Sequence, residues 1–462
     1  MSDFNSKFNE LKAEATANTP ARERLKNLFD EGQFTELNAY AKNNGSMTGV
    51  ITAYGYVEGN PVYAFSQDIT VNNGAFSKAQ AEKIYKVYDL AAKTGLPIVG
   101  IYDSFGADLS DGINAMTAYG EILMSVSNLS GVVPQVSVVA GTCAGTAAML
   151  AQSADFVIMA KDAEMFVTPN TSIENLAVTS AKAGTTAVVC DDDKAAIETA
   201  KNILIKLPQN NLSPVPMFEF SEPSVNFGNN DSADKIVRAT ADDESVIELY
   251  PEYGKSAYTA LATISGGTVG VIATNKVSEK LTAQDCSKIA RFVRTCDAFA
   301  VPVITLVDTE GFEVSDSLEV QGAVKNMTML AHAYAEATTI KISVVTGKAY
   351  GPAYIALAGK GANSDLAYAL PNAVISPLDP LAAAEFFTHD KLKGAGDINK
   401  TRQTLADEYV SNEASAIVAS SKGCIDNIVT AKELRSTISG AIEVMAGKRI
   451  SRLPKKHSNM PL

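Results

Sequence analysis

Four glycine-bearing turns are the parts of this chain best suited to chemistry. Each follows a run of apolar, β-type residues: residues 104–107 and 143–146 in the first half, and residues 310–312 and 349–353 in the second. Glycine after a strand lets the backbone approach a ligand closely, and a helix that begins there leaves its first N–H groups without internal partners. Two such turns side by side can direct two N–H donors at one oxygen, which is an oxyanion hole suited to the enolate of a thioester. The alternative is tight strand–helix packing without a ligand.

Side chains that usually act as nucleophiles or bases are scarce. The only histidines are His332, His389 and His457, so a mechanism with a histidine base must use one of these three. Cys143 lies within a glycine turn, but no histidine or acid is near it in the sequence. A small, buried packing residue is therefore the favoured interpretation of this cysteine, and the sequence favours chemistry that runs on backbone amides.

The acidic residues near these turns allow two interpretations. Asp103 and Asp308 each end a β run just before a glycine turn. Either could be a general base, but capping of the following helix is the favoured role. The three aspartates at 191–193 resemble a metal cluster, yet acids that directly precede a helix usually complement the charge of the helix start. No metal is assigned.

The elements that hold the glycine turns occur twice. Residues 83–107 match residues 288–312 at a constant offset of 205, and the match resumes at Gly141 and Gly347 with an offset of 206. A register shared over so many residues indicates two copies of one domain. In each copy helical patterns alternate with buried β runs, which predicts an α/β layered fold.

The stretch between the two copies has a different composition. It is rich in proline and asparagine, which is typical of linkers and turns. We predict an N-terminal domain over residues 1–215, a linker over 216–257 and a C-terminal domain over 258–462.

Composition narrows the class of protein. The chain has 462 residues, of which 46% are hydrophobic and 20% charged, and this excludes bulk disorder. A net charge of −13 argues against nucleic acid or an anionic membrane surface as a partner. Five widely spaced cysteines without a CxxC pair fit a reduced, cytoplasmic compartment. The longest apolar stretch, residues 136–151, is interrupted by polar residues, so we expect buried core rather than a membrane span.

Several segments carry a resemblance to a known family. The first copy, with SFGADLSDG at 104–112 and AGTCAGTAAMLAQSADF at 140–156, resembles the crotonase superfamily. Nearly the whole chain, including ARERLKNLFDEGQFTE at 21–36, HAYAEATTIKISVVTGKAYGPAY at 332–354 and PKKHSNMPL at 454–462, resembles the carboxyltransferase subunits of biotin-dependent acyl-CoA carboxylases and decarboxylases, the propionyl-CoA and methylmalonyl-CoA group. The resemblance implies an α/β fold of tandem crotonase-like domains, each a ClpP/crotonase β-β-α superhelix.

The resemblance also implies an activity. The chain would be an enzyme subunit that moves a carboxyl group between biotin on a partner and an acyl-CoA such as propionyl-CoA or methylmalonyl-CoA, as a carboxylase or a decarboxylase. The acyl-CoA would bind the N-terminal domain, and biotin would enter against the C-terminal domain of a neighbouring subunit. One oxyanion hole would hold the thioester oxygen as an enolate, and the other would hold the ureido oxygen of biotin.

Site residues follow from the resemblance position by position. Gly145 and Thr146 are the catalytic positions on the acyl-CoA side, and Gly351 and Ala353 are those on the biotin side. Ile355 corresponds to a position that lines the acyl pocket, whereas the neighbouring tyrosines either wall a biotin slot or simply pack. The remaining substrate-binding positions are Gly106, Ala107, Tyr350, Pro352 and Tyr354.

Cofactors and partners are implied in the same way. The substrate would be a coenzyme A thioester, and biotin would be carried by a separate biotin carboxyl carrier protein, because this chain has no biotin-attachment sequence. A biotin carboxylase or a membrane decarboxylase subunit would complete the complex. The family expectation is a homo-oligomer, a hexamer, with no metal and no nucleic acid.

Departures from the family pattern leave two alternatives open. The usual Ala-Tyr-Gly-Gly-Ala is Ala-Tyr-Gly-Pro-Ala here, so Pro352 removes an N–H donor, and a stretch that usually follows the first copy is absent after Pro169. The chain could therefore be a catalytically weakened paralogue with an assembly or regulatory role. The other alternative is a biotin-independent crotonase-type acyl-CoA hydratase, whose paired acids would come from Asp108, Asp111 and Glu164.

Overall fold

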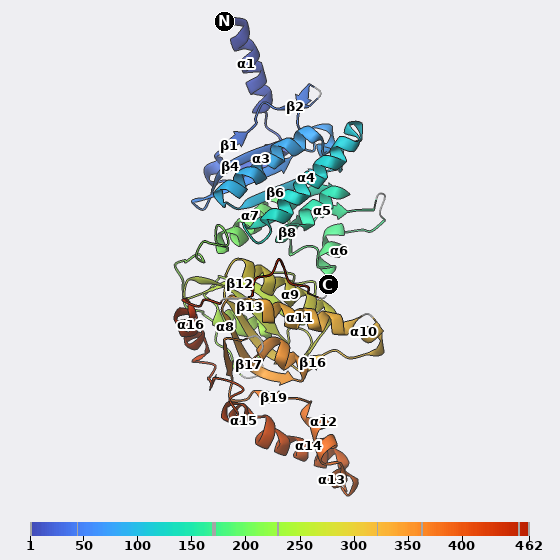
Figure 1. The fold of residues 1–462 in the computed structure, drawn as a ribbon, viewed down its shortest axis with the longest axis vertical. Helices are drawn as coiled ribbons and strands as arrows, with labels where there is room; N and C mark the ends of the chain where they lie inside the picture. The colour runs from blue at the N-terminus through green and yellow to red at the C-terminus, as the bar shows by residue number, and fades with distance from the viewer. Residues whose placement is uncertain are drawn as a thin grey trace. The chain divides into compact units, whose positions relative to one another are not determined.

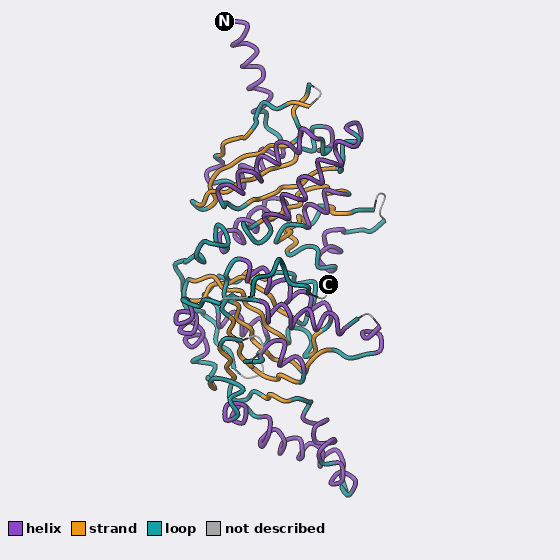
Figure 2. The backbone as a smooth tube through the Cα atoms, in the orientation of Figure 1, coloured by secondary structure: helices purple, strands orange, loops and turns teal. Residues whose placement is uncertain are grey.

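The computed structural model describes residues 2–43, 45–168, 172–228, 231–320, 322–361, 364–450 and 453–460. The chain divides into two compact units, Met1–Pro216 and Met217–Leu462 (Figure 1). Each unit is a sheet of strands with helices packed on it, as the colouring by secondary structure shows (Figure 2). Within the described residues, no helix is long and apolar enough to cross a membrane.

The first unit contains an eight-stranded sheet in the order β1-β4-β5-β6-β7-β8-β10, with β9 paired to β7. Strand β4 is antiparallel to its neighbours β1 and β5, and the pairs from β5 onward are parallel. The strands are β1 (Phe34–Leu37), β4 (Val50–Val57), β5 (Asn60–Gln67), β6 (Ile98–Ser104), β7 (Gln135–Ala144), β8 (Phe156–Ala160), β9 (Glu164–Phe166) and β10 (Val188–Cys190), besides the small hairpin β2 (Lys42–Asn43) and β3 (Ser46–Met47). The helices are α1 (Ser2–Ala15), α2 (Pro20–Leu28), α3 (Lys78–Thr94), α4 (Ile113–Leu129), α5 (Thr146–Gln152), α6 (Leu176–Lys182) and α7 (Asp193–Lys206).

The second unit repeats this sheet strand for strand. Its order is β11-β12-β13-β15-β17-β18-β20, with β19 paired to β17. The strands are β11 (Ile247–Glu248), β12 (Ala257–Ile264), β13 (Gly267–Thr274), β15 (Val303–Thr309), β17 (Lys341–Tyr350), β18 (Leu366–Ala369), β19 (Val374–Ser376) and β20 (Asn427–Ile428), with a separate pair β14 (Lys280–Leu281) and β16 (Gly311–Phe312). The helices are α8 (Ala233–Thr240), α9 (Ala283–Ala298), α10 (Asp316–Val320), α11 (Ala323–Glu336), α12 (Pro380–Phe387), α13 (His389–Lys393), α14 (Ile398–Tyr409), α15 (Ala416–Ser421) and α16 (Leu434–Met445).

Local sequence explains the long helix before each β6-type strand. Helix α3 begins after Ser77, whose hydroxyl accepts from the Gln80 amide, and it ends at Gly95 in the left-handed conformation. Helix α9 begins with a capping box between Thr282 and Asp285. Each cap satisfies N–H groups that the first helical turn leaves without partners. The apolar faces of both helices are buried, so the repeated sequence pattern produces the same layer in both units.

Of residues 216–257, which the composition sets apart as a linker, all but Pro216 fall within the second unit. Helix α8 buries Val237 in the second core, and β11 extends the sheet beside β12. After β19, helices α12, α13 and α14 form an extension with a small core of its own around Leu392 of α13 and Leu405 of α14. The C-terminal tail also packs on this unit, since Met460 lies against Ala290 of α9 and Ala333 of α11.

Candidate functional site: two pairs of glycine turns

A bulge at the carboxyl ends of two neighbouring strands shapes the first pair of turns. The pairing of β6 with β7 shifts register after Tyr102 and resumes at Ser104, which pairs with Cys143. In the second unit the pairing of β15 with β17 shifts after Val307 and resumes at Thr309. A bulge re-aims the residues that follow it, and in both units the glycine turns begin directly after this irregularity.

The aspartate at each bulge bonds to the neighbouring strand. The Thr142 amide donates to Asp103 Oδ1 over 3.1 Å, and the Lys348 amide donates to Asp308 Oδ1 over 2.8 Å. The prediction that these aspartates cap helices is wrong, because the N-cap of α4 is Gly112, without a side-chain cap, and ahead of α10 it is the Ser315 hydroxyl that accepts from the Leu318 amide. The carboxylates point sideways across the sheet rather than forward to the next helix.

In both units the strand that donates this bond passes so close to the aspartate that only glycine fits beside it. A Cβ atom on Gly141 would lie 2.3 Å from Asp103 Oδ1, and one on Gly347 would lie 2.3 Å from Asp308 Oδ1. No side chain fits at that distance, so glycine is required one residue before each bonded amide. This explains why the sequence repeat resumes at these two glycines.

The first turn leaves one amide free. Phe76 N–H donates to Gly106 O over 2.8 Å, and Asp108 N–H donates to Phe76 O over 2.9 Å. The Ala107 amide, which lies between these two bonds, has no hydrogen bond within the described part of the chain. Gly106 has a positive φ of 102°, and a Cβ atom there would lie 3.2 Å from Ala144 O, so the two turns of this unit lie next to each other.

In the second turn of the first unit, one amide is hydrogen-bonded within the fold and the next amide is not. Gly145 N–H donates to Phe166 O over 2.8 Å, and Thr146 is the first residue of α5. No bond to the Thr146 amide occurs among the described residues, as expected for the first position of a helix. We call Gly106–Ala107 together with Gly145–Thr146 the first glycine site. Of the two donors expected at Gly145 and Thr146, the Gly145 amide is already engaged, because it extends the β7–β9 ladder.

Equivalent positions in the second unit form the second glycine site, Gly311–Phe312 with Gly351–Pro352. Gly351 N–H donates to Ser376 O over 2.9 Å, as Gly145 does to Phe166. The next residue is Pro352, which has no N–H to offer where Thr146 has one. Glu313 N–H donates to Leu281 O over 2.8 Å, so the Phe312 amide points the opposite way, like that of Ala107. The second glycine site therefore presents one amide where the first presents two.

The other residues expected near the second glycine site differ in how far their side chains are buried. Tyr350 is 6% exposed within β17, and burial raises the pKa of its hydroxyl to about 12. Tyr354 donates its hydroxyl to Cys424 O over 3.0 Å, so it packs against its own unit. Ala353 is fully buried, whereas Ile355 is 57% exposed. Of these four side chains, Ile355 is the one that is exposed, and Tyr354 is half-buried.

Side-chain chemistry at the first glycine site is suppressed by burial. Cys143 is fully buried, and its desolvation, aided by the negative charge of Asp103, raises the pKa of the thiol well above its usual value. A thiol held protonated is a poor nucleophile. Asp108 accepts from the Ser110 amide over 3.0 Å, and Asp111 accepts from the Lys78 amide over 2.6 Å. Of the three acids proposed for a hydratase, Asp108 and Asp111 thus hold the backbone, and Glu164 is exposed at the start of β9.

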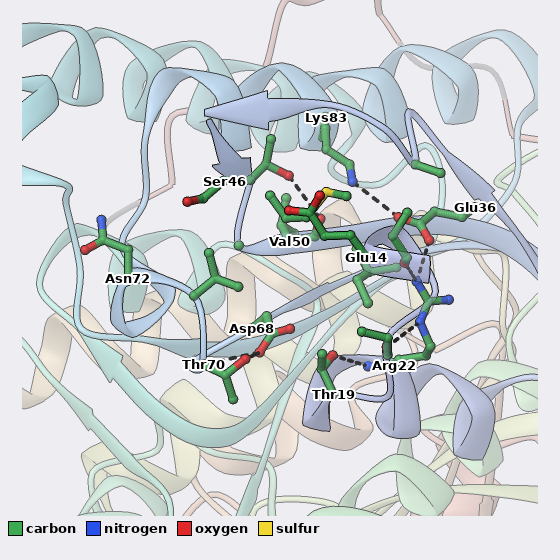
Figure 3. Close-up of a pocket in the computed structure, with 18 residues that line it drawn as sticks. Glu14, Thr19, Arg22, Glu36, Ser46, Val50, Asp68, Thr70, Asn72 and Lys83 are labelled. Carbon is green, nitrogen blue, oxygen red and sulfur yellow. Dashed lines mark hydrogen bonds and ion pairs between the residues drawn. The ribbon is translucent and has the colours of Figure 1, made fainter. Parts of the chain in front are cut away.

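A cavity of about 410 Å³ in the first unit is lined by residues of α1, α2, β4 and α3, and neither glycine turn contributes to its wall (Figure 3). Its wall includes Asn72, whose Nδ2 donates to Asp108 Oδ2 over 3.2 Å. Farther along the wall, Arg22 Nη2 lies 2.7 Å from Glu36 Oε2, and Lys83 Nζ lies 3.4 Å from the other oxygen of the same carboxylate (Figure 3). Burial lowers the pKa of Lys83. The cavity is lined by mixed charges rather than by one sign.

The three consecutive aspartates have separate roles. Asp192 caps α7 by accepting from the Ala195 amide over 2.7 Å, and Asp193 pairs with Arg24. Within the described residues, no group of three or more histidine, cysteine, aspartate or glutamate side chains is arranged to hold a metal. Pro169, after which the family segment is absent, lies outside the described residues.

Two α/β units with one strand order, each carrying a pair of glycine turns at the ends of parallel strands, define a tandem crotonase-like protein. A solved transcarboxylase 12S structure, described as a hexamer with methylmalonyl-coenzyme A and methylmalonic acid bound, superimposes with a TM-score of 0.93 at 30% identity, covering 100% of this chain and 98% of the other. The predicted fold is confirmed.

The family is equally clear from the sequence relatives. The family model "Carboxyl transferase domain" matches residues 13–460, and the chain belongs to this family. It is 34% identical to the methylmalonyl-CoA decarboxylase subunit alpha of Propionigenium modestum, over 98% of this chain and 95% of that one. It is 33% identical to the propionyl-CoA carboxylase beta chain of Saccharopolyspora erythraea, over 98% and 92%. The predictions of the family and of a carboxyltransferase enzyme are confirmed.

Sequence reasoning missed two contributors to these sites. The Phe312 amide is the counterpart of the Ala107 amide, and the offset of 205 residues between the copies was the signal that could have found it. Arg24, which contacts Asp103, lies about 80 residues away in the chain, and no local pattern connects the two.

Proposed function

We propose that this carboxyltransferase moves a carboxyl group between biotin on a partner protein and a short acyl-CoA of the propionyl or methylmalonyl type. The observation that carries the proposal is the pair of free amides at Ala107 and Thr146, in a chain whose family and relatives act in carboxyl transfer. Two convergent N–H donors stabilise the negative charge that develops on a thioester oxygen.

The chemistry proposed for the first glycine site needs no side-chain nucleophile. The thioester oxygen accepts hydrogen bonds from the Ala107 and Thr146 amides while the bond between the α-carbon and the carboxyl carbon forms or breaks. The electron pair of that bond is delocalised onto the oxygen as an enolate, and the fixed amides need no reorganisation to receive it. Gly106 and Gly145 serve by letting the backbone come close, not by donating their own amides.

Biotin, when bound at the second glycine site, supplies the nitrogen that accepts or releases the carboxyl group. The residues there fit one hydrogen bond to a ureido oxygen, from the Phe312 amide, with Gly311 allowing the approach. Pro352 removes the second donor. In this assignment the N-terminal domain (1–215) binds acyl-CoA and the C-terminal domain (258–462) binds biotin, with Ile355 exposed to contact the acyl group.

An assembly with other subunits accompanies this function. Exposed apolar side chains surround both glycine sites, with Leu109 91% and Ile113 77% exposed at the first and Val314 78% and Val320 90% exposed at the second. Clusters of exposed apolar side chains mark interaction surfaces, so they favour a hexamer in which the two sites of different subunits meet. A biotin carboxyl carrier protein and a biotin carboxylase or membrane decarboxylase subunit complete the complex, and its compartment is the cytoplasm.

The decisive experiment is an assay of the purified chain. We expect decarboxylation of malonyl-CoA or methylmalonyl-CoA in the presence of free biotin, together with binding of the CoA thioester in calorimetry. Crotonyl-CoA hydration without biotin would instead establish the hydratase alternative. Absence of both turnover and thioester binding would reject the catalytic function.

A second candidate, a weakened paralogue with an assembly or regulatory role, has one observation in its favour. Pro352 takes away one of the two donors that the scaffold of the second glycine site is shaped to present, and losing an oxyanion donor costs roughly 10²–10³ in rate. Thioester binding without turnover, combined with hexamer formation, would favour this candidate over the first.

A further inference from the structure

A buried ion pair lies directly behind the first glycine site. Arg24 of α2 directs Nη1 at Asp103 Oδ2 over 2.7 Å and Nε at Asp193 Oδ2 over 2.9 Å. The side chains of Arg24 and Asp103 are 10% and 7% exposed. Arg24 does not bond to the glycine turns themselves; it reaches β7 through Asp103 and through a longer contact of 3.5 Å from its Nη2 to Ala140 O.

Asp103 connects this ion pair to the turn. Its Oδ2 atom receives the guanidinium, while its Oδ1 atom accepts from the Thr142 amide over 3.1 Å. The Asp103 amide is itself bonded, since it donates to Gln67 Oε1 over 3.3 Å. Thr142 lies four residues before Thr146 on the bulged end of β7. Arg24 thus fixes the Asp103 carboxylate at one oxygen, and the other oxygen, through the Thr142 amide, fixes the path of β7 into the turn.

The second unit makes the same connection without a cation. Asp308 Oδ1 accepts from the Lys348 amide, but its Oδ2 receives the neutral amide of Asn275 over 2.7 Å. An aspartate held by a charged, bidentate-capable guanidinium is restrained more strongly than one held by an amide. The stronger restraint occurs at the site that presents two donors, and the weaker one at the site that presents one.

We propose that Arg24 is a positioning residue for carboxyl transfer: by holding Asp103, it fixes the end of β7 so that the Thr146 amide converges with the Ala107 amide. The expected effect on kcat rests on the proposed function, whereas the expected effect on the position of the β7 end does not. Donors must lie within a few tenths of an ångström of their working positions, and a misplacement of about 1 Å costs roughly 10² in rate. A relaxed β7 end would therefore lower kcat more than it weakens binding of the thioester.

The test compares Arg24→Gln and Asp103→Asn with Arg22→Gln in the full-length chain. Arg22 is the matched control, because it lies on the same helix and forms a similarly buried ion pair, with Glu36, that does not contact Asp103 (Figure 3). We expect Arg24→Gln and Asp103→Asn to lower kcat by roughly tenfold to 100-fold with little change in KM for the thioester. Arg24→Lys should recover part of the loss, since it keeps the charge.

Hydrogen exchange of the peptide spanning residues 142–148 supplies a readout that needs no activity. Exchange there should be faster in Arg24→Gln and unchanged in Arg22→Gln. The proposal is overturned if Arg22→Gln lowers kcat equally, or if Arg24→Gln lowers only the melting temperature and leaves both kcat and this exchange unchanged. If the wild-type chain has no activity, the proposed function fails, while the exchange data still decide whether Arg24 holds the turn.

Discussion

The two units share one scaffold and differ in the atoms that face the ligand. Both have the same strand order, the same bulge, and an aspartate bonded across it to the neighbouring strand. Yet the residue after the second glycine is Thr146, the start of α5, in one unit and Pro352, which leads into a π-helical turn over Tyr354–Ala358, in the other. The scaffold is maintained by packing, which tolerates either residue there, whereas the number of amide donors changes with a single substitution.

Giving the first glycine site the proline of the second should have the largest effect. Thr146→Pro removes the free amide, and we expect the carboxyl-transfer rate to fall by roughly 10²–10³. Proline is well accepted at the first position of a helix, so the fold should be retained. The measurement is kcat with an acyl-CoA, beside circular dichroism. Thr146→Ala keeps the amide and should retain most activity; an equal loss in both variants would contradict a role for the amide.

Replacing the glycine that lies against each aspartate should destabilise both units to a similar extent. Gly141→Ala and Gly347→Ala each bring a Cβ atom to 2.3 Å from a carboxylate oxygen, and such overpacking costs about 1–3 kcal/mol of unfolding free energy. Urea unfolding measures the cost. Gly120→Ala in α4 and Gly440→Ala in α16 are controls, one per unit, where a Cβ atom meets nothing within 4 Å. These should be neutral or stabilising. Tolerance of alanine at 141 but not at 347, or the reverse, would show that the two bulges are not equivalent.

Restoring an N–H donor at position 352 tests whether the second glycine site binds an oxygen atom of the ligand. Pro352→Ala introduces an N–H, and the rate should rise by at least roughly two- to tenfold, the worth of one net hydrogen bond of about 0.5–1.5 kcal/mol, and by at most the roughly 10²–10³ of an oxyanion donor. The measurement is biotin-dependent turnover at saturating acyl-CoA. Ala353→Gly leaves Pro352 in place and should not raise the rate. An unchanged rate in Pro352→Ala would favour the weakened paralogue.

The smallest expected difference between the units is in the pH dependence of stability that the equivalent buried lysines, Lys83 and Lys288, produce. Lys83 lies near Glu36, whereas Lys288 donates to the carbonyls of Ala257 and Gly254, and burial lowers the pKa of Lys288 from 10.5 to about 7. The charged groups near it are Lys276, Glu248 and Asp285.

Because the unfolded state binds this proton more tightly, stability is lost as pH falls towards 7 and regained above it. Relative to Lys288→Met, the wild type should gain about 1 kcal/mol of unfolding free energy between pH 7 and 8. Urea unfolding of both proteins at the two pH values measures this difference. Lys83→Met is the matched variant in the first unit. Parallel pH profiles for the wild type and Lys288→Met would show that Lys288 is already solvated.

Much of the fold was predictable because the chain contains an internal comparison. The match between residues 83–107 and 288–312 predicts two α/β copies, and each copy has the expected sequence of helix, buried strand and glycine turn. The predicted linker, residues 216–257, was harder to place, because proline and asparagine are as common in loops that pack on a domain as in linkers. Only the contacts of α8 and β11 reveal that it associates with the second unit.

The candidate sites were predictable by position but not by atom. The sequence identifies Gly145 as a turn residue, yet its amide bonds to Phe166 because β9 returns beside β7. Asp103 and Asp308 were expected to bond forward along the chain, and they bond sideways instead. In both cases the partner is distant in the sequence, and periodicity carries no information about such pairs.

The sequence by itself determines the two-copy α/β plan, the family, the scarcity of histidine and the loss of an N–H at Pro352, because each of these is a property of residue type and spacing. The tertiary structure decides which amides remain free, since an amide is free only when no neighbouring strand takes it. It also decides that Arg24 lies behind Asp103, because only folding brings α2 against the ends of β6 and β7.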